Sequence, residues 1–284
     1  MIKIEPLISL DPETIFNAFS DAFSDYEMQL DRKELEAMLQ RRGFVPALSF
    51  GAFYKGELVS FTFNGIGNYN GIKTAYDTGT GTIREFRGRG LATRVFKDSV
   101  PFLKEAGIDR YLLEVLQHNR GAFSVYRKLG FEITREFNYF SSALDEVRIP
   151  ENESVEFPEI RPVDLHAREE MKKFWDFTPS WQNDFGSIER SLEDFKMIGA
   201  FSRGKMAGYA IFAPHSGDLT QIAVEKSLRR KGIATAMLKV ILKEIRHTSV
   251  KLINAERGCD SITGFLNSFS ILPAGTQFEM QKIL

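Results

Sequence analysis

The fold is decided by a stretch that reads Arg87-Gly88-Arg89-Gly90-Leu91-Ala92, and by a second that reads Arg229-Arg230-Lys231-Gly232-Ile233-Ala234. Both follow the pattern Arg-x-x-Gly-x-Ala, and each lies between a strand-like run and an amphipathic helical pattern. A strand, a basic turn and a helix start form a cradle for a phosphate, because free backbone N–H groups and the helix dipole point toward it. One such turn is a weak signal. Two turns with matched surroundings predict a duplicated domain built around a phosphate-bearing cofactor.

The repeat extends beyond the two turns. Residues 51–57 resemble residues 199–205 at an offset of 148 (199 minus 51), whereas the turns are 142 apart (229 minus 87). The second copy is therefore shorter by six residues (148 minus 142), lost from the stretch corresponding to 64–82, as expected of a hairpin loop.

An acidic, proline-containing segment at residues 145–158 has no apolar periodicity and is typical of a linker. The sequence therefore predicts an N-terminal domain over 1–144, a linker over 145–158 and a C-terminal domain over 159–284.

Composition limits the function classes. The chain has 284 residues, enough for two cores, and is 43% hydrophobic and 26% charged, as globular proteins are. Its 37 basic and 38 acidic residues do not favour a nucleic-acid partner. Four His and one Cys argue against a disulfide framework and a His/Cys-rich metal site, so no metal is expected. Without an 18-residue apolar run or a signal segment, we expect a soluble cytoplasmic protein with no membrane partner.

Downstream of the first turn, the pattern Asn-x-x-Ala-x-x-x-Tyr-x-x-Leu-Gly-Phe occupies residues 119–131, after a strand-like Leu-Glu-Val at 113–115. This order resembles the GNAT superfamily of acyl-CoA-dependent N-acyltransferases, most of all the enzymes that acetylate ribosomal-protein N-termini. The resemblance implies an α+β fold of two GNAT-like domains in tandem, each a mixed, mostly antiparallel sheet flanked by helices. It also implies an acetyltransferase that uses acetyl-CoA as co-substrate.

In that family the basic turn binds the pyrophosphate of coenzyme A. The resemblance carries this role to Arg87, Gly88, Arg89, Gly90, Leu91, Ala92 and Thr93. Glycines let backbone amides approach an anion, and the arginines add charge.

Upstream, Gly79 and Gly81 fall on one face of a strand, where they predict either a ligand groove or a simple bulge. By resemblance, the Thr82 amide donates to the developing oxyanion.

Three polar residues are candidates for the chemistry. Tyr126 can protonate the leaving thiolate, and the resemblance supports this role; the alternative is a packed aromatic ring. Glu114, twelve residues earlier, is the candidate base, or it pairs with a neighbour. Asp77, expected on the Gly79/Gly81 face, is the reserve base. Asn119 binds the cofactor or caps the following helix, or does both.

The second copy lacks these residues. An ungapped offset of 140 places Cys259 at Asn119, Leu266 at Tyr126, Asn254 at Glu114, and Ser270 and Ile271 at Gly130 and Phe131. We interpret the second copy as a degenerate domain that shapes the acceptor site, stabilises the first domain, or binds coenzyme A at 229–234 without turnover.

The leading hypothesis is transfer of an acetyl group to a primary amine by direct attack, with the chemistry in the N-terminal domain. The acceptor would be a small-molecule amine or a peptide N-terminus. The alternative is a non-catalytic acyl-CoA-binding or regulatory protein of the same fold. A Rossmann domain is disfavoured, because the first turn has Thr93 at the third glycine position and the second turn lacks the glycine pair.

Overall fold

The computed structural model describes residues 1–26, 29–150 and 158–284. The chain divides into two compact units: unit 1 holds residues 1–134 and 279–284, and unit 2 holds residues 135–278.

These bounds differ from the predicted domains. Two long strands, β6 (Glu132–Ala143) and β12 (Leu272–Ile283), each have residues in both units. Residues 135–144 therefore group with the second unit, and residues 279–284 with the first. Residues 151–157 of the predicted linker lie outside the described part of the chain.

The elements of unit 1 are β1 (Ile2–Pro6), α1 (Pro12–Ala22), α2 (Arg32–Arg42), β2 (Phe50–Tyr54), β3 (Glu57–Tyr69), β4 (Ile72–Thr82), α3 (Leu91–Glu105), β5 (Arg110–Leu116), α4 (Arg120–Lys128) and the start of β6. Its strands lie in the order β1-β2-β3-β4-β5, followed by the end of β12. Neighbours from β1 to β4 are antiparallel, whereas β4 and β5 are parallel.

Local sequence explains where the first two helices begin. The carboxylate of Asp11 accepts a hydrogen bond from the Thr14 amide at the start of α1. At α2, Asp31 and Glu34 form a capping box in which each side chain accepts from the other residue's amide. Such caps satisfy amides that have no partner inside the helix.

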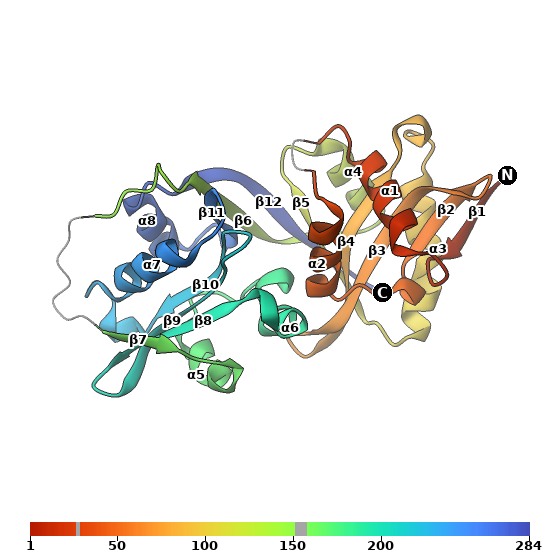
Figure 1. Cartoon of the computed structure of the whole chain (residues 1–284). Helices are drawn as coiled ribbons and strands as arrows, with labels where there is room; N and C mark the ends of the chain where they lie inside the picture. Colours follow the sequence, from red (N-terminus) through yellow and green to blue (C-terminus); the bar gives the residue numbers. More distant parts are fainter. Residues whose placement is uncertain (27–28, 151–157) are drawn as a thin grey trace. The chain divides into compact units, whose positions relative to one another are not determined.

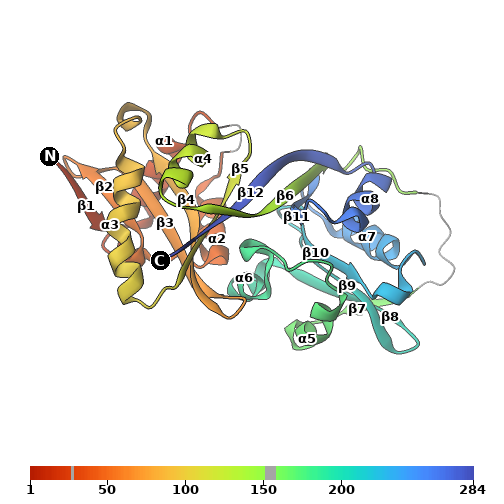
Figure 2. The ribbon, with the colours of Figure 1, turned by 180° about the vertical axis from the view of Figure 1, so that it is seen from behind.

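Helices cover both faces of the unit 1 sheet. Figure 1 shows α1 and α2 in front of its strands, and Figure 2, from behind, shows α3 on the opposite face. On the α1/α2 face, Phe19 packs with Phe61 and Phe63, two stacked rings of β3 whose centroids are 4.2 Å apart. On the α3 face, Phe96 meets Tyr111 edge-on. Helices therefore pack on both faces of the unit 1 sheet, whose strands β4 and β5 carry several of the candidate site residues.

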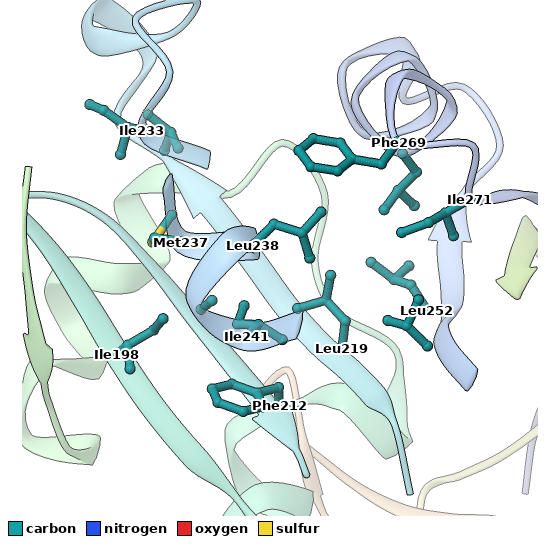
Figure 3. Packing of buried hydrophobic residues seen from close by; sticks show 14 of the residues in the cluster. Ile198, Phe212, Leu219, Ile233, Met237, Leu238, Ile241, Leu252, Phe269 and Ile271 are labelled. Atoms are coloured by element: carbon teal, nitrogen blue, oxygen red, sulfur yellow. The ribbon is translucent and has the colours of Figure 1, made fainter. Parts of the chain in front are cut away.

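The elements of unit 2 are β7 (Glu159–Pro162), α5 (Arg168–Met171), α6 (Phe185–Arg190), β8 (Lys196–Ser202), β9 (Lys205–Ala213), β10 (Asp218–Val224), α7 (Ile233–Glu244), β11 (Ser249–Glu256) and α8 (Asp260–Ser268), with most of β6 and β12. The strand order is β7-β8-β9-β10-β11-β6. Figure 3 shows the core under α7, where Leu238 and Ile241 lie close to Phe212, Leu219 and Leu252.

The two units repeat the same order of strands, basic turn and helices, as the sequence predicts. The length difference also lies where it was expected. Strands β3 and β4 have 13 and 11 residues, whereas β9 and β10 have 9 and 7. The prediction of a mixed, mostly antiparallel sheet with flanking helices is confirmed for each unit.

Candidate functional site

Strands β4 and β5 of unit 1 separate toward their C-terminal ends. Their parallel pairing covers only 74–76 against 110–112, although β4 continues to Thr82 and β5 to Leu116. The Ile83 amide donates to the Val59 carbonyl on β3. Because amides alternate in direction along a strand, the Thr82 N–H points away from β3, toward the side on which β4 and β5 have separated. Its geometry fits the oxyanion donor that the sequence predicts.

A β-bulge decides which side chains of β4 share a face. Gly79 is opposite Phe63, but Asp77 is opposite Asn64, so Thr78 is an extra residue in β4. A bulge of this kind interrupts the alternation of side chains. Asp77 therefore lies with Thr80, whose hydroxyl donates to Asp77 Oδ2 at 2.8 Å.

Asp77 also contacts the predicted acid. The Tyr126 hydroxyl donates to Asp77 Oδ2 at 3.0 Å, and the Gly79 amide donates to Oδ1 at 3.0 Å. The Tyr126 ring packs against Phe131, 5.6 Å between centroids. The residues of this pair come from β4 and α4, on the face that α3 covers.

Of the two predicted alternatives for Gly79 and Gly81, the structure contains the bulge, and packed side chains take the place of the ligand groove. A Cβ atom at Gly81 would come within 2.6 Å of the Phe61 ring and 2.9 Å of Ala22 Cβ, and one at Gly79 would reach Phe19 at 3.5 Å. The missing side chains let α1 and Phe61 pack closely against β4. The placement of Asp77 on the Gly79/Gly81 face was also wrong, because the Thr78 bulge moves Asp77 to the opposite face.

Glu114 lies on the other side of the sheet from Tyr126. In a parallel pair, register partners share a face, so Tyr76 lies with Leu112, and by alternation with Glu114. The structure agrees, because the Tyr76 hydroxyl is hydrogen-bonded to Glu114. The Arg42 guanidinium of α2 donates to the Thr78 carbonyl at 3.0 Å beside them. The predicted base and the predicted acid thus lie on opposite faces of the sheet.

Burial dominates the electrostatics of this site. It raises the pKa of Tyr126 well above its usual value, and the charge of Asp77 and the hydrogen bond to it raise this pKa further. Burial also raises the pKa of Asp77, and the hydrogen bonds from Thr80, Tyr126 and Gly79 oppose that rise. Tyr126 is therefore a protonated phenol at neutral pH.

The basic turn leads into a helix start whose first amides have no partner inside the helix. Gly88 and Gly90 have φ values of 74° and 70°, a left-handed conformation that favours glycine. Gly90 caps α3 without any side-chain hydrogen bond, so the first amides of α3 (Leu91, Ala92 and Thr93) have no partner inside the helix. This matches an anion cradle.

The arginine side chains of the turn donate hydrogen bonds to neighbouring groups of unit 1. The Arg87 guanidinium donates to Asp25 Oδ1, the Ala22 carbonyl and the Thr82 carbonyl at 2.8, 2.8 and 3.1 Å. We call this arrangement the arginine clamp. Arg89 donates to the Glu85 carbonyl at 2.8 Å. Arg87 thus fixes the end of β4 to the end of α1, and the turn's backbone remains its main contribution to an anion site.

Asn119 has the capping role that the sequence offered. Its Oδ1 accepts from the Ala122 amide at 3.1 Å at the start of α4, and its Nδ2 donates to the Tyr26 hydroxyl at 3.2 Å. Tyr26 belongs to the segment after α1 and is 43% exposed. A cofactor contact by Asn119 stays a prediction.

Unit 2 repeats the clamp. Arg229 donates to Asp176 Oδ1, the Phe174 carbonyl and the Val224 carbonyl at 2.9, 3.3 and 3.1 Å. Arg230 occupies the position of Gly88 and adopts φ 64°, and the amides of α7 begin after Gly232 at φ 82°.

A cavity of about 590 Å³ adjoins this second turn. Its wall includes the turn itself, the end of β10 and the start of α8. The lining is mixed. Its apolar side chains include Trp175, Phe177, Ile222, Val224, Ile233, Leu252, Ile262 and Phe265, and its polar ones include Asp176, Gln221, Arg229, Lys231 and Asn254.

The structure supports the ungapped register of the second copy. Helix α8 begins and ends 140 residues after α4 (260 minus 120 and 268 minus 128), and Cys259 stands at its N-cap as Asn119 does at that of α4. Cys259 makes no capping hydrogen bond. The unit 2 bulge at Thr220 matches the one at Thr78, which places Leu219 at the position of Asp77.

Sequence reasoning missed Thr80 and the two aspartates of the clamps. The aspartates carry a signal, because Phe23-Ser24-Asp25 and Phe174-Trp175-Asp176 share the pattern Phe-x-Asp ahead of each hairpin. Thr80 had no such signal, since its contact depends on the bulge.

Comparison with known proteins identifies the class. The Acetyltransferase (GNAT) family matches residues 13–131 and 160–260, so the chain belongs to this family. Its two matched regions fall in the two units. The protein is an acyltransferase of the GNAT family, with two GNAT domains in tandem.

Two curated relatives are similar to parts of the chain. N-alpha-acetyltransferase MAK3 of Arabidopsis thaliana is 28% identical over 134 residues, which are 45% of this chain and 68% of that protein. N-alpha-acetyltransferase 30 of Schizosaccharomyces pombe is 33% identical over 67 residues, 23% of this chain and less than half (45%) of that protein.

Solved structures share the fold over the whole chain. A tandem GNAT protein from the clavulanic acid biosynthesis pathway has a TM-score of 0.72 at 14% identity, covering 100% of this chain and 98% of its own. A putative acetyltransferase from Pyrococcus horikoshii has a TM-score of 0.69 at 16% identity, covering 100% and 89%. In the described residues, no helix is both long and apolar enough to cross a membrane.

Proposed function

We propose that the protein transfers an acetyl group from acetyl-CoA to a primary amine, and that unit 1 performs the chemistry. The observation that carries the proposal is the separation of β4 and β5, beside a carboxylate on one face of the sheet and a phenol on the other. The family supplies the reaction class, and the names of the two curated relatives favour a peptide N-terminus among the possible amines.

Each residue has a separate task in this reaction. Glu114 accepts the proton of the amine as its nitrogen attacks the thioester carbonyl carbon. The Thr82 amide donates a hydrogen bond to the carbonyl oxygen as it becomes negative. Tyr126 donates its proton to the sulfur as the C–S bond breaks, so coenzyme A leaves as a thiol. The first amides of α3 hold the pyrophosphate.

The experiment is an acceptor screen with acetyl-CoA, a panel of peptides with free N-termini and a panel of small amines. Release of the coenzyme A thiol above the acceptor-free rate, with an acetylated product in the mass spectrum, supports the proposal. Tyr126→Phe and Glu114→Gln should each lower kcat by about 10²-fold or more while acetyl-CoA still binds. Full activity in either variant would remove that residue from the mechanism.

The cavity of unit 2 favours a second candidate function, binding of an acyl-CoA without turnover. Leu266 and Asn254 stand at the positions of the acid and the base, yet the basic turn and a cavity beside it remain.

Calorimetry with acetyl-CoA separates the two sites through matched variants at one motif position. Ala92→Asp should remove a site in unit 1, and Ala234→Asp a site in unit 2. Each substitution places a carboxylate at the helix start, where it repels the phosphate groups of the ligand and competes for the same amides. A stoichiometry of one that only Ala92→Asp abolishes would contradict the second candidate for acetyl-CoA.

A further inference from the structure

Asp77 has its oxygens occupied on the face where Tyr126 lies. Oδ2 accepts from the hydroxyls of Tyr126 and Thr80, and Oδ1 accepts from the Gly79 amide. Three donors directed at one carboxyl group suit an ionised carboxylate. A carboxylate so engaged, on the face opposite Glu114, is poorly placed to take a proton from the amine.

Unit 2 shows that the fold does not require this polar pair. At the matching positions stand Leu219 and Leu266, both fully buried in the apolar core. Leu219 lies near Leu238, Ile241 and Leu252 in Figure 3. The bulge that places the residue is kept in both units. The unit that lacks the phenol also lacks the carboxylate, as expected if the two act together.

We propose that Asp77 is a positioning residue for Tyr126: its carboxylate holds the phenol in place and keeps it protonated until the thiolate leaves. This inference rests on the proposed function, because it assumes that Tyr126 is the acid. When the C–S bond breaks, the sulfur takes the bonding electron pair and the phenolic proton. Tyr126 becomes a phenolate beside a carboxylate, so water returns a proton to it readily.

Other groups act on the pair and have to be considered in any pH experiment. Tyr111 on β5 and Tyr26 in the segment after α1 act on the pair through their charges, and Arg42 on α2 and Tyr76 on β4 act on Asp77 from the other face of the sheet. None of these is changed in the variants below, so their contribution is common to all the proteins compared.

The first test is an NMR titration of the full chain labelled with ¹³Cζ-tyrosine. The Tyr126 signal is assigned by its absence in Tyr126→Phe. In Asp77→Asn the pKa of Tyr126 should lie below that of the wild type, because the negative charge and its hydrogen bond are lost. Asp98→Asn, which removes an exposed carboxylate of α3, should leave the titration unchanged. The same Tyr126 titration in the wild type and in Asp77→Asn would overturn the proposal.

The second test is a double-mutant cycle on kcat, with the acceptor that gives the highest rate in the screen. Tyr126→Phe should lower kcat by about 10²-fold or more. Asp77→Asn should lower kcat by about tenfold and move the alkaline limb of the pH dependence of kcat to lower pH. In the Tyr126→Phe background, Asp77→Asn should lower kcat no further, because Asp77 acts only through the phenol. Additive losses would overturn the proposal. Thermal unfolding of each variant checks that the fold is intact.

The outcomes separate this proposal from the proposed function. If the wild type transfers acetyl to no acceptor, the proposed function fails, and the NMR titration alone decides whether Asp77 controls the protonation of Tyr126.

Discussion

The two glycines of β4 offer a matched pair of substitutions, Gly81→Ala and Gly79→Ala, on the same face of one strand. A Cβ at Gly81 would lie 2.6 Å from the Phe61 ring and 2.9 Å from Ala22 Cβ. Neither neighbour can move away at low energetic cost, because Phe61 is fully buried against Phe63 and Ala22 belongs to a packed helix. A Cβ at Gly79 would meet only ordinary contacts at 3.5 and 3.7 Å.

We therefore expect Gly81→Ala to lower the free energy of unfolding by about 1–3 kcal/mol, the usual cost of overpacking a core. Gly79→Ala should be neutral or stabilising by about 0.4–1 kcal/mol, since it restricts the unfolded chain without a clash. Denaturant unfolding of both variants measures these changes, and calorimetry with acetyl-CoA is run in parallel.

Two results would refute this reasoning. Equal destabilisation by both substitutions would show that the contacts at Gly81 do not set the cost. A loss of acetyl-CoA affinity in Gly79→Ala, with unchanged stability, would restore the ligand groove that the structure replaces with packing.

Three further predictions concern the turn, the clamp and the cavity. Gly90→Ala should cost about 1–2 kcal/mol of unfolding free energy from backbone strain alone, because a Cβ there meets open space; a neutral result in denaturant unfolding would contradict this. The hydrogen bond from Arg87 lowers the pKa of Asp25 to about 2, so the clamp's stabilisation is present above the unfolded-state pKa and is lost as pH falls through about 2. Asp25→Asn should remove that part of the acid dependence in pH-resolved unfolding, and an unchanged profile would argue against the clamp. Trp175 lines the unit 2 cavity, so acetyl-CoA binding there should change tryptophan fluorescence in the wild type and not in Trp175→Phe; the same change in both would exclude Trp175 as the reporter.

Much of the architecture could be predicted from local patterns. The repeated basic turns, their offsets and the helical register of 119–131 are properties of short segments, and the structure confirms the tandem arrangement and the position of the shorter hairpin. The capping role of Asn119 also follows from its place before a helix.

The parts that failed depend on non-local packing. Strict alternation along β4 put Asp77 with the glycines, but one extra residue at Thr78 reverses the face. The glycines allowed a bulge as one alternative, yet they did not indicate at which residue it would fall. The glycines suggested a space for a ligand, yet a phenyl ring from β3 occupies it. The compact units differ from the predicted domains for a similar reason, since strand pairing groups residues far apart in the sequence.

The division of β12 between the units has a consequence for biosynthesis. Residues 279–284 belong to unit 1, and all of unit 2 is translated before they emerge from the ribosome. Unit 1 therefore cannot finish folding in the order in which it is made. An expression fragment that stops at residue 134 would lack its last β segment, whereas the intact chain couples completion of the first unit to synthesis of the second.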